Sequence, residues 1–170
     1  MDMDLTERFE FRYIRPEEAD QACDIEFECF PPNEYCSREM ITGRVVRVPQ
    51  SFYVAADRES GKLAGFLTSM ATDAEAFQDE FFSNADLFEP GGRNAMILGL
   101  EVRPAYQHQG IGKALMTNFL AMAKSEGRKR VILTCHEDKI PMYERMGFRN
   151  LGISGSVWGG ETWIEMDIVL

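Results

Sequence analysis

The chain has 170 residues and a net charge of −10, with 18 Lys and Arg against 28 Asp and Glu. Phosphate-backbone binding gains from clustered Lys and Arg, so this balance argues against a nucleic-acid-binding protein and is compatible with a cationic small-molecule substrate. No apolar run approaches the roughly 20 residues that cross a bilayer, and the acidic first residues lack the apolar core of a secretory signal. We therefore expect a cytoplasmic protein that binds neither nucleic acid nor membrane.

The N-terminal part of the chain predicts one strand, two helices and a β-hairpin. Alternation of β-prone residues marks the strand, and a proline followed by acids opens the first helix. Pro31 and Pro32 end that helix, and a turn signal at 58–61 separates the two hairpin strands. The expected ranges are 9–15 for the strand, 16–30 and 37–47 for the helices, and 51–57 and 62–70 for the hairpin.

Residues 72–94 predict an inserted loop with a short helix, because they are acidic, rich in phenylalanine and contain a Pro-Gly-Gly run. The phenylalanines either line a site or fix the loop to the protein, and we expect the second. They are Phe77, Phe81, Phe82 and Phe88.

The remainder of the chain predicts a central strand, a long helix, a buried strand, a short helix and a final hairpin. Apolar residues recur at helical spacing in the long helix, and Gly127 closes it. The expected ranges are 95–102, 110–127, 130–135, 139–147 and a hairpin within 152–170. The element order is then β-α-α-β-β-β-α-β-α-β-β, in a single mixed α/β domain that covers residues 1–170.

The segment between the central strand and the long helix has the features of an anion site. Backbone N–H groups at a helix N-terminus bind anions, and Gly110 and Gly112 leave the backbone open to a phosphate. A Walker A loop is excluded because Gln107 and Ala114 stand at its first Gly and its Ser/Thr positions. A dinucleotide fingerprint is excluded because Leu115 stands at its third Gly position. An ordinary strand-to-helix turn stays the alternative to phosphate binding.

The remaining pattern, Gln107-x-x-Gly110-x-Gly112 between an apolar strand and an apolar-striped helix, resembles the acetyl-CoA loop of the GNAT N-acetyltransferase superfamily. Three stretches resemble its arylalkylamine (serotonin) branch: CDIEFECFPPNEYC, RPAYQHQGIG and CHEDKIPMYERMGF. The resemblance implies a GNAT-type central mixed, splayed β-sheet flanked by helices. It also implies an enzyme that moves an acetyl group from acetyl-CoA to a primary amine without a metal. The four cysteines form no CxxC pair, which likewise argues against zinc.

The resemblance assigns the cofactor mainly to the backbone. The pantetheine chain is expected along Leu100, Glu101 and Val102, with the Leu100 N–H as donor to the tetrahedral oxyanion. Tyr143 is expected to protonate the departing CoA thiolate, and His136 stands where many members have an asparagine that contacts CoA. The pyrophosphate is expected on the loop residues Gln107, His108, Gln109, Gly110, Ile111, Gly112 and Lys113.

The general base is left open by the sequence. The serotonin enzymes carry a histidine pair on the central strand, and Met96 and Leu98 stand at these positions here. His136, Glu28 and Glu34 are the alternatives, with a surface role also open for both glutamates.

Two further residues near the expected cofactor are given no chemical role. Glu101 alternates with Leu100 on its strand, so we expect its side chain to face away from the thioester and to be structural. Cys135 ends a strand close to the expected CoA arm. Direct transfer is the usual route in the family, so no acyl-enzyme on Cys135 is expected.

The acceptor is expected to be a small apolar or aromatic amine held against an apolar wall. The same wall residues could instead pack in the core. They are Phe30, Pro31, Pro32 and Tyr35, with Met96 and Leu98 beside them. Two other functions stay open: acetylation of a protein N-terminus or lysine, and a non-catalytic acyl-CoA-binding or sensing module. A monomer and a homodimer are both compatible with the sequence.

Overall fold

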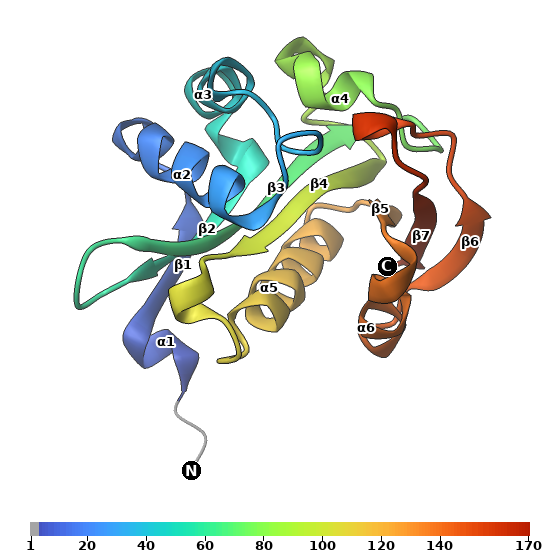
Figure 1. The fold of residues 1–170 in the computed structure, drawn as a ribbon. Helices are drawn as coiled ribbons and strands as arrows, with labels where there is room; N and C mark the ends of the chain where they lie inside the picture. The colour runs from blue at the N-terminus through green and yellow to red at the C-terminus, as the bar shows by residue number, and fades with distance from the viewer. Residues whose placement is uncertain (1–3) are drawn as a thin grey trace. The chain divides into compact units, whose positions relative to one another are not determined.

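The structure is a computed structural model, and it describes residues 4–170 (Figure 1). The strands are β1 Phe9–Tyr13, β2 Phe52–Asp57, β3 Leu63–Thr72, β4 Asn94–Val102, β5 Arg130–Cys135, β6 Arg149–Ile153 and β7 Ile164–Val169. The helices are α1 Leu5–Arg8, α2 Ala19–Cys29, α3 Arg38–Arg47, α4 Glu80–Ser83, α5 Ile111–Ser125 and α6 Ile140–Arg145. The strands pair in the order β1-β2-β3-β4-β5-β7-β6. The predicted α/β class is confirmed, and the element order matches once the short helices α1 and α4 are set aside.

The described chain divides into two compact units. The first comprises residues up to 68 together with 99–119, and the second comprises 69–98 and 120–170. The strands β3 and β4 and the helix α5 contribute residues to both units. The single domain over residues 1–170 stays a prediction. Between residues 4 and 170, no helix has the length and apolar character needed to cross a bilayer.

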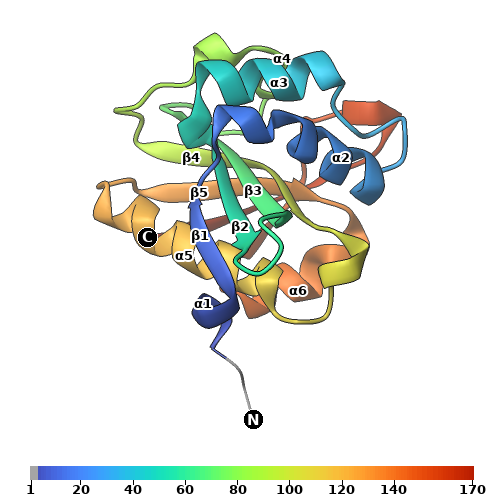
Figure 2. The same cartoon turned by 90° about the vertical axis from the view of Figure 1, so that its left-hand side faces the viewer.

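In the first unit, two helices cover one face of an antiparallel ladder. β1 pairs with β2 from Phe9↔Asp57 to Tyr13↔Tyr53. Figures 1 and 2 show α2 and α3 side by side over this ladder. The predicted helix over 16–30 begins as a 3-10 turn at Pro16–Glu18 before α2 starts, and Ser37 caps α3 by accepting the N–H of Met40 at 3.1 Å.

Gly65 sets the approach of β3 to the C-terminal half of β4. A Cβ atom at this position would overlap the backbone carbonyl oxygen of Glu101, which cannot move aside as a flexible side chain would. Only glycine therefore permits this spacing between the two backbones in the first unit.

In the second unit, β5 lies between β4 and β7. It pairs in parallel with β4 from Asn94↔Arg130 to Ile97↔Leu133, and antiparallel with β7. Val131, Ile132 and Leu133 are all buried, as expected of a strand covered on both faces.

The final hairpin begins earlier than predicted. Its first strand starts at Arg149, not within 152–170, because Gly147 adopts a φ of +102° directly after α6 and turns the chain straight into β6. The loop between β6 and β7 then carries a 3-10 turn at Trp158–Gly160.

The inserted segment 72–94 packs within the second unit through its phenylalanines. Phe77, Phe81 and Phe82 are buried, and Phe82 stacks on Trp158 with ring centroids 4.3 Å apart. Asp79 accepts hydrogen bonds from the hydroxyl of Ser156 and from the N–H of the following residue. Short helix α4 is thereby held on the loop between β6 and β7.

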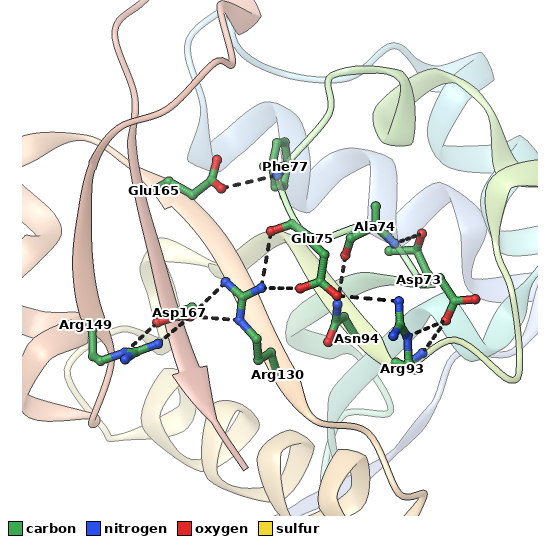
Figure 3. A network of polar contacts seen from close by, with 11 residues as sticks. Asp73, Ala74, Glu75, Phe77, Arg93, Asn94, Arg130, Arg149, Glu165 and Asp167 are labelled. Atoms are coloured by element: carbon green, nitrogen blue, oxygen red, sulfur yellow. Dashed lines mark hydrogen bonds and ion pairs between the residues drawn. The ribbon is translucent and has the colours of Figure 1, made fainter.

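A chain of ion pairs ties the start of the same segment to β5 and β7 (Figure 3). Arg130 donates to Asp167 at 2.9 Å through Nε and to Glu75 at 2.7 Å through Nη1. Arg93 in turn lies 3.6 Å from Glu75 and 3.5 Å from Asp73. Because Asp167 is fully buried, its end of the chain is screened least by water.

Candidate active site

The loop between β4 and α5 has the backbone shape of an anion site. It leaves β4 through a 3-10 turn at Pro104–Tyr106 and enters α5 at Ile111. His108 and Gly110 have left-handed φ values of +64° and +86°. Residues 107–110 are exposed, and the first N–H groups of a helix have no partner inside it. Such a turn before a helix start gathers N–H donors in one place, which suits a phosphate.

Gln107 braces this loop against the end of β4. Its Nε2 donates to the carbonyl of Val102 at 3.0 Å, and the thiol of Cys29 donates to the same carbonyl at 3.4 Å. One of the backbone groups expected to meet the pantetheine chain thus already accepts two donors. This role of the Gln107 side chain was not predicted, because it depends on how the loop folds back on the strand.

Glu28 at the end of α2 is engaged in an ion pair. Nη1 of Arg103 donates to its carboxylate at 3.2 Å, while Nε of Arg103 donates to the carbonyl of Leu63 at 2.9 Å. The Glu28 side chain is 42% exposed, so water screens the pair and the carboxylate stays accessible to a cation.

The predicted acceptor wall lies in the loop between α2 and α3. Phe30 and Tyr35 are half-buried and Pro31 is exposed. The Tyr35 ring packs on Phe27 with centroids 4.7 Å apart, and the half-buried Glu34 bonds its N–H to the Pro31 carbonyl at 2.9 Å. The loop therefore carries half-buried aromatic rings beside the half-buried carboxylate of Glu34.

Two buried carboxyl groups in the first unit face each other, and their pairing was not predicted from the sequence. Glu26 of α2 and Glu101 of β4 are 4% and 2% exposed, and their carboxyl groups are hydrogen-bonded to each other. The N–H of Cys36 donates to Oε2 of Glu26 at 2.7 Å, and buried Arg44 donates to the Thr68 hydroxyl at 3.2 Å. Burial, followed by the charge of Glu26, raises the pKa of Glu101 well above its ordinary value.

The burial of Glu26 could have been predicted from the sequence. Glu26 shares the buried stripe of α2 with Ala19, Ala22 and Cys23, at the spacing of one helix face. An acid on an apolar stripe is the signal for a buried, partnered carboxyl group. Its partner Glu101 lies far away in the sequence, so the pairing itself needed the fold.

In the second unit, Tyr143 is a buried residue of α6. Its ring packs edge-on against Phe148 at 5.8 Å between centroids, and burial, with a smaller effect of Cys135, raises the pKa of its hydroxyl. Burial also raises the pKa of Cys135 to about 11, and its thiol donates to the sulfur of Met166 at 3.6 Å. A hydroxyl with a raised pKa keeps its proton at neutral pH, and Cys135 is a protonated thiol, which is a poor nucleophile.

The other candidates of the second unit are packed among apolar and aromatic side chains. The His136 ring stacks on Trp163 with centroids 4.1 Å apart. Met96 is fully buried opposite Ile132 in the β4–β5 ladder, and Leu98 is half-buried. Met96 thus serves the core of the second unit in this structure.

The predicted site residues fall into two sets. The cofactor loop, Leu100 and the α2–α3 loop belong to the first unit, whereas Tyr143, His136 and Met96 belong to the second. Within the described residues, no group of three or more His, Cys, Asp or Glu side chains could hold a metal ion.

Residues 17–148 match the sequence pattern of the acetyltransferase (GNAT) family. The chain belongs to this family. The match confirms the family and the acetyltransferase class that the glycine loop and its flanking elements predicted. The roles of single residues in this GNAT chain stay predictions.

Two relatives of this GNAT chain are serotonin N-acetyltransferases. The protein from Mesocricetus auratus is 30% identical over 113 residues, which are 66% of this chain and 53% of that protein. The chain thus spans about half the length of that relative. The protein from Pan troglodytes is 28% identical over 159 residues, which are 92% of this chain and 75% of that protein.

A solved structure with the same fold is the GphF GNAT-like decarboxylase in complex with isobutyryl-CoA. It superposes with a TM-score of 0.74 at 22% identity and covers 94% of this chain and 98% of its own. At this identity the likeness establishes the GNAT fold and says nothing of the reaction.

Proposed function

We propose that this GNAT chain transfers an acetyl group from acetyl-CoA to a small primary amine by direct attack. The observation that carries the proposal is the exposed loop before α5, with left-handed backbone at His108 and Gly110. That loop places N–H donors at a helix start, which is the arrangement a pyrophosphate needs. The side chain of Lys113 adds a positive charge in the first turn of the helix.

The chemistry assigns distinct tasks to the backbone and to Tyr143. The N–H of Leu100 stabilises the oxyanion of the tetrahedral intermediate. Tyr143 gives its proton to the departing CoA thiolate, and its raised pKa keeps that proton available at neutral pH. An alkylammonium with a pKa near that of Lys is a free amine in only about one molecule in 10³ at pH 7, so the reaction also needs a proton acceptor.

The acceptor is a small aromatic or apolar amine. The net negative charge of the chain favours a cationic substrate. The loop between α2 and α3 offers the aromatic side chains of Phe30 and Tyr35. Serotonin N-acetyltransferases, which are relatives of this chain, also support this acceptor. Glu34 in that loop is the carboxylate proposed to meet the ammonium group, and Glu28 lies at the end of the neighbouring helix. Cytoplasmic localisation is part of this proposal.

A thiol-release screen tests the transfer. Arylalkylamines, aliphatic amines and basic or N-terminal peptides are each incubated with acetyl-CoA, and the acetylated products are identified by mass. We expect turnover with small amines and little with peptides. Turnover confined to peptides would replace the small-amine acceptor, and acyl-CoA binding without any turnover would mean a sensing module.

Tyr143→Phe tests the acid. We expect kcat to fall about 100-fold, because the thiolate must then leave unprotonated, while the dissociation constant of CoA changes little. Tyr53→Phe, which removes a half-buried hydroxyl from β2, is the matched control. An unchanged kcat in Tyr143→Phe would show that the proton comes from another group.

A further inference from the structure

Tyr106 directly precedes residues 107–113, called here the cofactor loop, and it is bonded to a buried carboxylate of another strand. It is the last residue of the 3-10 turn Pro104–Tyr106. Its hydroxyl donates to Oδ2 of Asp57 at 2.8 Å. Asp57 ends β2 and is 3% exposed. A hydrogen bond to a carboxylate shielded from water is stronger than one between neutral groups, so this contact fixes where the cofactor loop begins.

The carboxylate of Asp57 is itself held in place. Its Oδ1 accepts the N–H of Glu59 at 3.0 Å, and Nη2 of Arg8 lies 3.6 Å from its Oδ2. The backbone N–H of Asp57 donates to the carbonyl of Lys62 at 2.8 Å. The hydroxyl of Tyr106 lowers the pKa of Asp57 by more than burial raises it. Asp57 is therefore an ionised acceptor in a fixed position at neutral pH.

The ring of Tyr106 is also fixed by packing. It lies edge-on to the ring of Phe9, with centroids 5.9 Å apart, and Phe9 is fully buried in β1. The guanidinium carbon of Arg8 lies 5.9 Å from the centroid of the Tyr106 ring and 5.2 Å from that of Phe9. Tyr106 thus joins the start of the cofactor loop to β1, to β2 and to the end of α1, all within the first unit.

The cofactor loop itself is less well supported than Tyr106. Residues 107–110 are exposed, and a cavity of about 650 Å³, lined by Leu5, Gly110 and Lys113 among others, lies between α1 and the start of α5. His108 adopts a left-handed φ of +64°, which is unfavourable for a residue other than glycine. The conformation of this loop must therefore be maintained by contacts at its flanks.

Resting on the proposed role of the cofactor loop, we propose that Tyr106 and Asp57 are positioning residues that hold this loop in the conformation that binds the pyrophosphate of acyl-CoA. They act through the backbone that follows Tyr106 and need no contact with the cofactor. If the binding conformation is populated for only part of the time, the dissociation constant rises by the inverse of that fraction. The Tyr106–Asp57 contact therefore sets the affinity for acyl-CoA and leaves the transfer step unchanged.

Tyr106→Phe tests this inference, because it removes the hydroxyl and keeps the ring on Phe9. We expect the dissociation constant of CoA, measured by isothermal titration calorimetry, to rise about tenfold. With an amine that the unmodified protein acetylates, the KM for acetyl-CoA should rise by a similar factor while kcat and the KM for the amine stay unchanged. Tyr53→Phe removes a half-buried hydroxyl from the same strand as Asp57 and should change none of these quantities.

A double-mutant cycle tests whether Tyr106 acts through Asp57. Asp57→Asn replaces the charged acceptor by a neutral amide, so we expect it to weaken CoA binding in the unmodified background. In the Tyr106→Phe background the same substitution should have little further effect, because the hydrogen bond is already absent. Equal effects in both backgrounds would overturn the inference. If Asp57→Asn does not fold, because Arg8 then loses its buried anion, the CoA affinity of Tyr106→Phe alone decides.

The inference and the proposed acetyl transfer fail in different ways. If Tyr106→Phe has a lower melting temperature but binds CoA as the unmodified protein does, Tyr106 is merely structural and the acetyl transfer stands. If Tyr106→Phe weakens CoA binding but no amine is ever acetylated, the acetyl transfer fails and the positioning role stands, since it is measured on CoA alone. If the unmodified protein does not bind CoA, both fail.

Discussion

Asp167 and Glu101 are both buried acids, yet their surroundings move their pKa values in opposite directions. Burial raises both, but two arginines donate to Asp167: Arg130 at 2.9 Å and Arg149 at 2.9 Å. These hydrogen bonds outweigh burial and hold the pKa of Asp167 below its ordinary value. At Glu101 burial raises the pKa, and the facing carboxyl group of Glu26 raises it further. At the residue scale, the donor set around a buried acid therefore decides its chemistry, and Asp167 is a structural anion.

Asp167→Asn should destabilise the protein by about 3 kcal/mol at pH 7, because a buried pair loses one partner. The folded pKa of Asp167 is lowered, so its contribution is present above the unfolded value of about 3.9 and is lost as pH falls toward the folded pKa. Urea unfolding at neutral pH and near pH 3 measures this. The exposed Asp138→Asn is the control. If the difference in unfolding free energy between Asp167→Asn and the unmodified protein is the same at neutral pH and near pH 3, the assignment is contradicted.

At the scale of elements, the segment 72–94 has few contacts within itself and depends on contacts to other parts of the second unit. α4 is one turn long, too short to be stable alone, and it is held by Asp79, Phe82 and the loop that contains Ser156 and Trp158. The segment should open as a local unit before the sheet unfolds.

Asp79→Ala should weaken protection of this segment by about 2 kcal/mol, because a carboxylate that accepts two hydrogen bonds is removed. Hydrogen exchange of the amides in 77–88 measures the change, with β5 amides as an internal reference. Glu80→Ala removes an exposed acid from the same helix and is expected to leave exchange unchanged. Equal exchange in both variants would mean that the rings alone hold the segment.

The elements themselves were predictable because their signals are local. Alternation, prolines and capping residues placed the strands and long helices within a few residues, and the Q-x-x-G-x-G loop was found at the start of α5. The start of β6 was missed because it depends on the φ of Gly147, which no periodicity encodes. The pairing of Glu26 with Glu101 was missed because two residues far apart in the chain meet only through packing.

For the whole molecule, net charge is the property that a ligand meets first. A charge of −10 attracts an ammonium substrate and repels an anionic acyl-CoA at long range. Salt weakens both effects, since the screening length is about 10 Å at 0.1 M and about 30 Å at 0.01 M.

The KM for a cationic amine should therefore rise about two- to fivefold between roughly 0.02 M and 0.2 M KCl, while that for acetyl-CoA stays level or falls. Steady-state kinetics at both salt concentrations measures this, and a neutral osmolyte at equal osmolality controls for non-electrostatic effects. A fall in the amine KM with salt would mean that the chain's net charge does not act on the substrate.

Gly65 affects how the results of a mutational scan of this protein should be interpreted. Every substitution there drives a Cβ atom into the backbone carbonyl of Glu101, so a selection for activity would rank the position as intolerant as any catalytic one. Nothing at Gly65 reacts. If protein abundance is scored separately from turnover, substitutions at Gly65 should lower abundance, because they prevent correct folding. Substitutions at Tyr143 should instead lower turnover while the protein still accumulates.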